Sequence, residues 1–227
     1  MKSGPEVARS CAFFDVDGTL ISIKSMFSFL EFLIDELRIG ESERVKAYRA
    51  QLQQMIAEDA PREAINRFYY SLYAGLDVEL VARLGQQWYR LVRSRKDLFY
   101  PRMLEEIRRH QQQGVRIVLV SGSFRAILQP LADELGIDDL IAAPLAVQQG
   151  CYTGELTGLP TIGQGKAAGI LAYALEHPID TADCYAYGDD ISDIPMLESV
   201  GNPTTVNPDD TLRSICQQRR WPIIEAA

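Results

Sequence analysis

The chain has 227 residues, of which 47% are hydrophobic, so it can bury a sizeable core and global disorder is not expected. Its 31 acidic and 23 basic residues give a net charge of −8, which argues against a dedicated nucleic-acid-binding protein. The four cysteines lack C-x-x-C spacing, and no apolar stretch reaches the length of a membrane span, so we expect a soluble, cytoplasmic protein without a disulfide framework.

The first predicted element is a short buried strand over residues 11–16, and it delivers two carboxylates, Asp15 and Asp17, just before Gly18. Residues i and i+2 of an extended chain point to the same side, so the two carboxylates leave the strand together. Like charges at that distance repel unless a cation or a shared proton lies between them. Taken alone, the stretch is also consistent with an ordinary acidic turn.

Residues 25–94 show helical spacing only, which predicts four helices near residues 26–37, 45–55, 61–72 and 78–91. Pro61 is expected to open the third helix at its first position, and Asp77 to cap the fourth. We therefore predict an all-helical insertion, residues 23–95, between the two parts of a core domain, residues 1–22 and 96–227. The Phe and Tyr residues of the insertion are expected to form its own core.

From residue 101 onward, helices and strands alternate. The pattern predicts strands at 115–120, 140–147, 184–187 and 204–206, a small hairpin within 150–160, and helices at 101–110, 124–135, 165–175, 192–199 and 209–219. Pro130 predicts a kink or a late start of its helix, and Ser192 is expected to cap the short one. The fold class that follows is α/β, a Rossmann-like, mainly parallel sheet with helices on both faces.

Chemically active side chains gather at the predicted carboxyl ends of the strands, where ligands bind in open parallel sheets. They are Asp15, Asp17 and Thr19 after the first strand, Ser121, Gly122 and Ser123 after the second, Asp189, Asp190 and Asp193 after a later one, and Lys166 at a helix start. Each group alone could be a helix cap or a solvated loop. Together they indicate one site.

This set of residues suits phosphoryl transfer. Oxygens from Asp15, the Asp17 backbone and Asp189 suit a hard cation such as Mg²⁺, which neutralises charge on the transferring group. An aspartate can attack phosphorus to give an aspartyl-phosphate. Ser121, backbone N–H groups near Gly122 and Lys166 are donors for the phosphate oxygens. Asp17 can protonate the leaving alcohol and then activate water, with a pKa raised by its acidic neighbours.

Four motifs in this order resemble the haloacid dehalogenase superfamily of phosphatases. They are Asp15-Val16-Asp17-Gly18-Thr19-Leu20, Val120-Ser121-Gly122-Ser123, Lys166, and Gly188-Asp189-Asp190-Ile191-Ser192-Asp193. A helical insertion between the first two motifs is similar to the phosphoserine-phosphatase-like branch, in which a helical cap covers the core.

The resemblance implies a role for each matching residue. Asp15 would be nucleophile and metal ligand, Asp17 acid/base and backbone metal ligand, and Asp189 a metal ligand. Thr19 would orient Asp15 or the phosphate, and Asp193 would be a partner of metal-bound water or of Lys166. Members of this type are usually Mg²⁺-dependent phosphomonoesterases.

Two positions depart from the family pattern. Lys24 stands where phosphoserine phosphatases commonly place a glutamate for the substrate ammonium, so we expect a substrate with a carboxylate or a further phosphate near the ester. Asp190 replaces a small residue and would bind the metal or face water. Arg62, Arg67 and Tyr69 are further candidates for contact with the substrate.

The sequence therefore predicts a Mg²⁺-dependent phosphatase of a small phosphorylated metabolite, without a nucleic-acid or membrane partner. A phosphotransferase that passes the group to an acceptor alcohol is an alternative within enzymes. A non-catalytic phospholigand-binding protein is the alternative outside them, although it would have no use for Asp17. Dehalogenase chemistry is the least expected, because that branch does not need Asp17 as acid/base.

Overall fold

The computed structural model describes residues 10–137 and 139–226. Within them, six strands form one sheet in the order β3-β2-β1-β6-β7-β8, with every neighbouring pair parallel. The strands are β1 (Cys11–Phe14), β2 (Arg116–Val120), β3 (Asp139–Ile141), β6 (Tyr185–Gly188), β7 (Asn202–Val206) and β8 (Ile223–Ile224). The parallel Rossmann-like sheet predicted from the sequence is confirmed.

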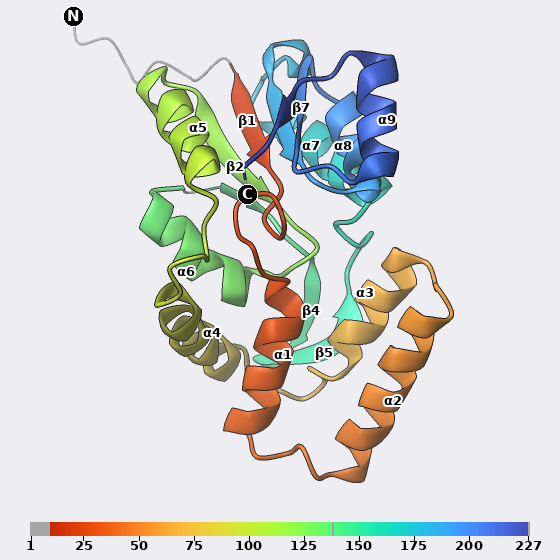
Figure 1. The fold of residues 1–227 in the computed structure, drawn as a ribbon. Helices are drawn as coiled ribbons and strands as arrows, with labels where there is room; N and C mark the ends of the chain where they lie inside the picture. The colour runs from red at the N-terminus through yellow and green to blue at the C-terminus, as the bar shows by residue number, and fades with distance from the viewer. Residues whose placement is uncertain (1–9, 138, 227) are drawn as a thin grey trace, which may run out of the picture.

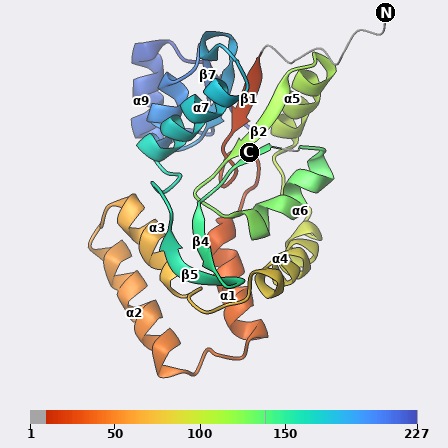
Figure 2. The ribbon, with the colours of Figure 1, turned by 180° about the vertical axis from the view of Figure 1, so that it is seen from behind.

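Helices cover both faces of this sheet (Figures 1 and 2). They are α5 (Pro101–Gln112) and α6 (Arg125–Leu135) on one face, and α7 (Gln164–Glu176), α8 (Ile194–Glu198) and α9 (Asp210–Arg219) on the other. Successive side chains of the central strand β1 serve the two faces in turn. Phe14 packs in one core with Met103 and Ile107 of α5, and Phe13 packs in the other with Ile170 of α7. Burial on both faces explains why β1 is continuously apolar.

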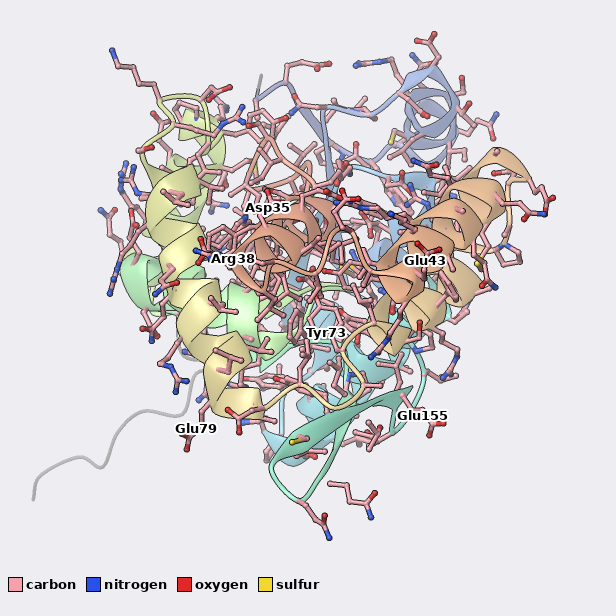
Figure 3. The ribbon with its side chains drawn as sticks, turned by 90° about the horizontal axis from the view of Figure 1, so that it is seen from below. Asp35, Arg38, Glu43, Tyr73, Glu79 and Glu155 are labelled. Carbon is pink, nitrogen blue, oxygen red and sulfur yellow. The ribbon has the colours of Figure 1, made fainter. Side chains whose placement is uncertain are left out.

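The predicted helical region forms four helices beyond the carboxyl ends of the strands, in the lower part of Figure 1. They are α1 (Ser25–Glu36), α2 (Glu43–Ala57), α3 (Arg62–Ser71) and α4 (Val78–Arg93). Asp77 caps α4 by accepting from the Leu80 N–H, as expected. Pro61 stands one position earlier than predicted, at the N-cap of α3. Figure 3 views these helices from below, with the buried Tyr73 between them.

The region after β3 differs from its prediction. A single strand over 140–147 was wrong, because the chain leaves the sheet after Ile141 and Pro144, which has no N–H to donate, precedes a separate strand. The hairpin pairs β4 (Leu145–Gln148) with β5 (Cys151–Leu156), earlier in the chain than the predicted 150–160. Gln149 and Gly150 both have positive φ, as a tight two-residue hairpin turn requires. Strand β5 packs on α3, away from the main sheet.

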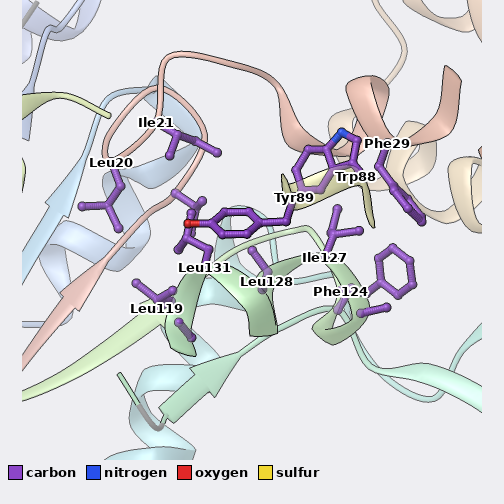
Figure 4. Packing of buried hydrophobic residues seen from close by; sticks show 14 of the residues in the cluster. Leu20, Ile21, Phe29, Trp88, Tyr89, Leu119, Phe124, Ile127, Leu128 and Leu131 are labelled. Carbon is purple, nitrogen blue, oxygen red and sulfur yellow. The ribbon is translucent and has the colours of Figure 1, made fainter. Parts of the chain in front are cut away.

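A close helix contact joins the helical region to the core. Helix α6 begins at Arg125 and runs through Pro130, so of the two predicted alternatives, a kink or a late start, the late start was wrong. Pro130 has no N–H for the Ala126 carbonyl one turn earlier. Helix α4 places Gly85 against that carbonyl, and a Cβ at Gly85 would lie 2.1 Å from the Ala126 oxygen. Figure 4 shows the apolar packing around this contact, with Trp88 and Tyr89 of α4 facing α6.

The composition led to expectations about the cysteines and about membrane-spanning segments. The four cysteines are free, and Cys11, Cys184 and Cys216 are buried while Cys151 is partly exposed. Across the described part of the chain, no helix is both long and apolar enough to cross a membrane.

Candidate functional site

The candidate site is a cavity of about 370 Å³ between the carboxyl ends of the strands and helices α1 and α3. The sequence-predicted residues that line it are Asp15, Asp17, Lys24, Ser121, Gly122, Ser123, Lys166, Asp189, Asp190 and Asp193. The segments that follow the carboxyl ends of β1, β2 and β6 supply most of them, as the parallel topology requires. The structure thus brings together residues that lie up to 178 positions apart (193 − 15).

Lys166 lies between two buried carboxylates. Its Nζ donates to Asp15 Oδ1 and to Asp193 Oδ1, each at 2.6 Å. Burial acts to lower the pKa of Lys166, but the charges of Asp15 and Asp193 outweigh it and raise the pKa above its usual range. The lysine is therefore held as a cation at Asp15, and its place in the first turn of α7 is explained by these partners.

The Asp17 carboxyl group is buried, and only one of its two oxygens is hydrogen-bonded within the described residues. Its Oδ2 accepts from the Ser25 N–H at 2.8 Å and from the Ser25 hydroxyl at 2.9 Å. Its Oδ1 has no hydrogen-bond partner among the described residues. Burial raises the pKa of Asp17 to about 6, against the lowering effect of Ser25. Ser25 was not predicted, although a helix start after Lys24 offers free N–H donors to a nearby carboxylate.

Asp189 occupies space that a side chain at position 18 would fill. Gly18 has φ of +103°, and a Cβ there would lie 2.1 Å from Asp189 Oδ2. Thr19 Oγ1 donates to Asp189 Oδ1 at 2.9 Å and makes a longer contact of 3.4 Å with Asp15 Oδ2. Burial first, and then the Asp15 charge, raise the pKa of Asp189 to about 8. The carboxyl groups of Asp15 and Asp189 therefore lie close enough to disfavour a negative charge on both.

Asp190 does not simply face water. It accepts from Arg62 Nη1 of α3 at 2.6 Å and from the Ser192 N–H at 2.8 Å. The short helical turn Ile191–Asp193 is thus capped by Asp190, and the prediction of Ser192 as the cap was wrong. Asp190 connects the fourth motif to the helical region through Arg62.

Lys24 lies at the acidic side of the cavity. Its Nζ donates to the Asp17 carbonyl oxygen at 3.0 Å and lies 3.9 Å from Asp189 Oδ2. Of the other candidates for substrate contact, Arg62 and Tyr69 line the cavity. Arg67 instead donates to the Gly158 carbonyl oxygen and is not among the lining residues.

The loop Ser121–Ser123 is fixed from inside and from α3. The Ser123 N–H donates to Ser121 Oγ at 3.1 Å. The Gly122 carbonyl oxygen accepts from Asn66 Nδ2 at 2.9 Å and from the Tyr70 hydroxyl at 2.8 Å. No sequence signal pointed to Asn66 or Tyr70, because a lone Asn and a Tyr on an amphipathic helix are typical of ordinary packing.

The acidic groups are close enough to share a cation. Carboxylate oxygens of Asp15, Asp189 and Asp193 lie within 4.8 Å of one another. Asp193 is fully engaged, because its second oxygen accepts from the N–H groups of Asp189 and Asp190 at 3.2 and 3.3 Å. Asp15 and Asp189 line the cavity and keep carboxylate lone pairs for a hard cation, while the nearby Asp17 carbonyl oxygen accepts one hydrogen bond from Lys24.

Residues 12–198 match the family model of haloacid dehalogenase-like hydrolases. The chain belongs to this family. A probable phosphatase of Mycobacterium tuberculosis is 31% identical over 96% of this haloacid dehalogenase-like chain and 75% of its own length. A phosphoserine phosphatase of the same organism is 27% identical (94% of this chain, 70% of its own), and a histidinol-phosphatase of Neisseria meningitidis is 26% identical (95% and 98%).

Solved structures agree with this family assignment. A protein of unknown function from Bordetella pertussis superposes with a TM-score of 0.86, at 27% identity, covering 97% of this chain and 100% of its own. A phosphoserine phosphatase with an analogue of its phospho-aspartyl intermediate superposes with a TM-score of 0.62, at 22% identity and coverage of 96% and 93%. The resemblance to the phosphoserine-phosphatase-like branch of haloacid dehalogenase-like proteins is confirmed at the level of family and fold.

Proposed function

We propose that this chain is a Mg²⁺-dependent phosphatase that hydrolyses a small phosphomonoester through an aspartyl-phosphate on Asp15. The observation that carries the proposal is the placement of Asp15 in the cavity, bonded to the cationic Lys166 and facing the Ser121–Ser123 loop and Asp189. Phosphatases among its relatives support the reaction class.

The donor set fits a hard divalent cation. Asp15, Asp189 and the Asp17 carbonyl group offer only oxygen ligands, and burial first and then the Asp15 charge raise the pKa of Asp189, which a bound cation would offset. We propose these three as the residues that hold Mg²⁺. When bound, the ion neutralises charge on the phosphoryl group during transfer.

In the first step, Asp15 Oδ2 attacks phosphorus while the bond from phosphorus to the ester oxygen breaks. Lys166 holds Asp15 Oδ1 at 2.6 Å, whereas the Thr19 hydroxyl contacts Oδ2 at a longer 3.4 Å, so Oδ2 is the oxygen more available for attack. Ser121 Oγ, the Gly122 N–H and Lys166 Nζ donate to the phosphate oxygens.

Asp17 moves the proton in both steps. Its free Oδ1 protonates the departing alkoxide, and Ser25 holds the other oxygen in place. In the second step, the Asp17 carboxylate takes a proton from water as the water attacks phosphorus, which releases phosphate and restores Asp15. A pKa of about 6 keeps both protonation states accessible near neutral pH.

We propose that charged side chains of the cavity select the alcohol part of the substrate. Lys24 and Arg62 bring positive charge to the cavity, which supports a substrate with a carboxylate or further phosphate near the ester. The Lys24→Glu variant tests this: we expect it to shift the preference from anionic towards cationic alcohol parts. An unchanged profile across a panel of phosphorylated metabolites would contradict that role.

The Asp15→Asn variant tests the mechanism. We expect turnover of p-nitrophenyl phosphate with Mg²⁺ to fall by at least about a thousandfold, because an amide is not a nucleophile toward phosphorus. Asp35→Asn is a matched control, since Asp35 is exposed at the end of α1 (Figure 3). Substantial activity of a folded Asp15→Asn protein would exclude the covalent route.

A further inference from the structure

Asn66 is a buried polar residue in the cavity that the proposed reaction leaves without a role. It lies on α3, one helical turn after Arg62, and its residue surface is only 2% exposed. It lines the same cavity as Asp15 and Asp17. A polar side chain so deeply buried is expected to have all its hydrogen bonds satisfied.

The orientation of the Asn66 amide is fixed by its neighbours. The Gly122 carbonyl oxygen, 2.9 Å away, can only accept, so the NH₂ group must face it. The same NH₂ group also lies 3.6 Å from Met26 Sδ, a weak acceptor. The amide oxygen Oδ1 therefore points away from these groups, and it has no partner within the described residues.

An unpaired buried acceptor favours a ligand that brings a donor. A substrate without a donor leaves Oδ1 desolvated and unpaired, whereas one with an N–H or O–H group satisfies it. The same side chain is tied to Gly122 in the candidate phosphate-binding loop. This tie fixes the position of the acceptor relative to that loop, so Asn66 can recognise a donor close to an ester whose phosphate the loop binds.

We propose that Asn66 Oδ1 is a specificity-determining acceptor that selects phosphomonoesters with an amine or hydroxyl group near the ester. This rests on the proposed phosphatase function and names the substrate class of the same site. Phosphoserine and histidinol phosphate, the compounds named for two relatives, both carry an amine beside the ester carbon, which is the chemistry that such an acceptor recognises.

The test compares matched alkyl phosphates that differ only in one donor. Wild-type protein with Mg²⁺ is assayed on 2-aminoethyl, 3-aminopropyl and 2-hydroxyethyl phosphate against ethyl and propyl phosphate. We expect kcat/KM for at least one donor-bearing ester to exceed that of its alkyl analogue by about tenfold or more. Asn66→Leu should abolish this ratio, and Asn66→Ala serves as a second variant should Leu fail to fold.

Two further variants separate recognition from loop positioning. Asn66→Asp keeps an acceptor but loses the donor to Gly122, so its rate should fall while the preference for donor-bearing esters remains. Tyr70→Phe removes only the other hydrogen bond to the Gly122 carbonyl oxygen. It should therefore lower kcat/KM for all substrates in parallel and leave the ratio between donor-bearing and alkyl esters unchanged.

The outcomes distinguish the two proposals. No wild-type preference for donors, or a preference that survives Asn66→Leu and Asn66→Ala, would overturn the role of Asn66 while phosphatase activity stands. An equal loss for all substrates in those variants would make Asn66 a support of the loop only. Absence of wild-type turnover, p-nitrophenyl phosphate included, would overturn the proposed function and this inference with it.

Discussion

The position of Lys166 follows from its partners and not from its helix. A cation in the first turn of α7 opposes the helix dipole. The two carboxylates at 2.6 Å compensate for this and for burial, so all three groups depend on one another. Removal of any one partner would leave an uncompensated buried charge. The three side chains are therefore stable only when the strand ends and α7 bring all of them together.

His110 is a buried titratable residue outside the candidate site. It is fully buried on α5, and its Nε2 lies 2.8 Å from the Tyr187 hydroxyl. Burial first, and then the Arg109 charge, lower the pKa of His110 from 6.5 to about 4. Between these values the unfolded chain binds a proton that the folded chain does not, so the free energy of unfolding must decrease as pH falls from about 6.5 to about 4.

We predict that His110→Phe flattens this pH dependence. The wild-type contribution lost across the interval is up to about 3 kcal/mol, from about 1.4 kcal/mol per pKa unit. Urea unfolding between pH 4 and 7 measures it. His177→Phe, at the end of α7, is the matched control and should retain the wild-type slope. An equally steep slope in His110→Phe would assign the acid sensitivity to other groups.

At the scale of elements, the contact of α4 with α6 depends on one glycine. Gly85 lies against the Ala126 carbonyl oxygen, the acceptor that Pro130 leaves free in the α6 ladder. A methyl group 2.1 Å from a backbone oxygen forces the helices apart, because neither backbone can rotate away.

We therefore predict that Gly85→Ala lowers the free energy of unfolding by about 1–3 kcal/mol, although Ala favours helix. Thermal unfolding measures this as a lower midpoint. Gly40→Ala is the control, because its added Cβ would meet only Ile34 Cγ2 at an ordinary 3.5 Å. A stabilised Gly85→Ala protein would mean that propensity outweighs the clash.

The elements with local signals were predictable, and those that depend on tertiary contacts were not. Asp77 caps its helix as predicted, and Asp209 at the start of α9 and the left-handed Gly136 at the end of α6 are residue types typical of these positions. The break at Pro144 was overlooked, because the apolar run after Leu140 looks continuous when only burial is considered.

The same distinction holds within the candidate site. The order of the four motifs was enough to bring their residues to one place, because parallel strands end at the same edge. The partners Ser25, Asn66 and Tyr70 come from helices whose packing the sequence does not specify. The link of Asp190 to Arg62 joins residues 128 positions apart, and only the structure could reveal it.

At the scale of the whole molecule, the helical region shares a hydrophobic core with the sheet. Phe29 of α1 and Trp88 of α4 belong to the same buried cluster as Phe124 and Leu131 of the core (Figure 4). The aromatic residues of the helical region, which were expected to form its own core, belong to a core that it shares with the sheet domain. Helix α2 buries far less, with only Val45, Tyr48 and Leu52 buried along its length.

We predict that α2 and α4 of the helical region open at different rates. Amide hydrogens of α2 should exchange by local opening well before those of α4, because few buried apolar contacts hold α2. Hydrogen exchange followed by mass spectrometry measures this per peptide. Uniform protection of α2 and α4 would show that the region moves as one rigid body.

The ion pair of Arg62 with Asp190 is partly exposed to solvent. It joins α3 to the loop after β6 through side chains that are 53% and 28% exposed, whereas Trp88 and Tyr89 of α4 belong to the buried core. Dissolved salt screens exposed charge pairs and leaves apolar contacts largely intact. Ionic strength should therefore weaken the link between Arg62 and Asp190. The contact of the buried Tyr70 with the Gly122 carbonyl oxygen keeps α3 on the core, so salt should loosen this edge of the cavity without unfolding the protein.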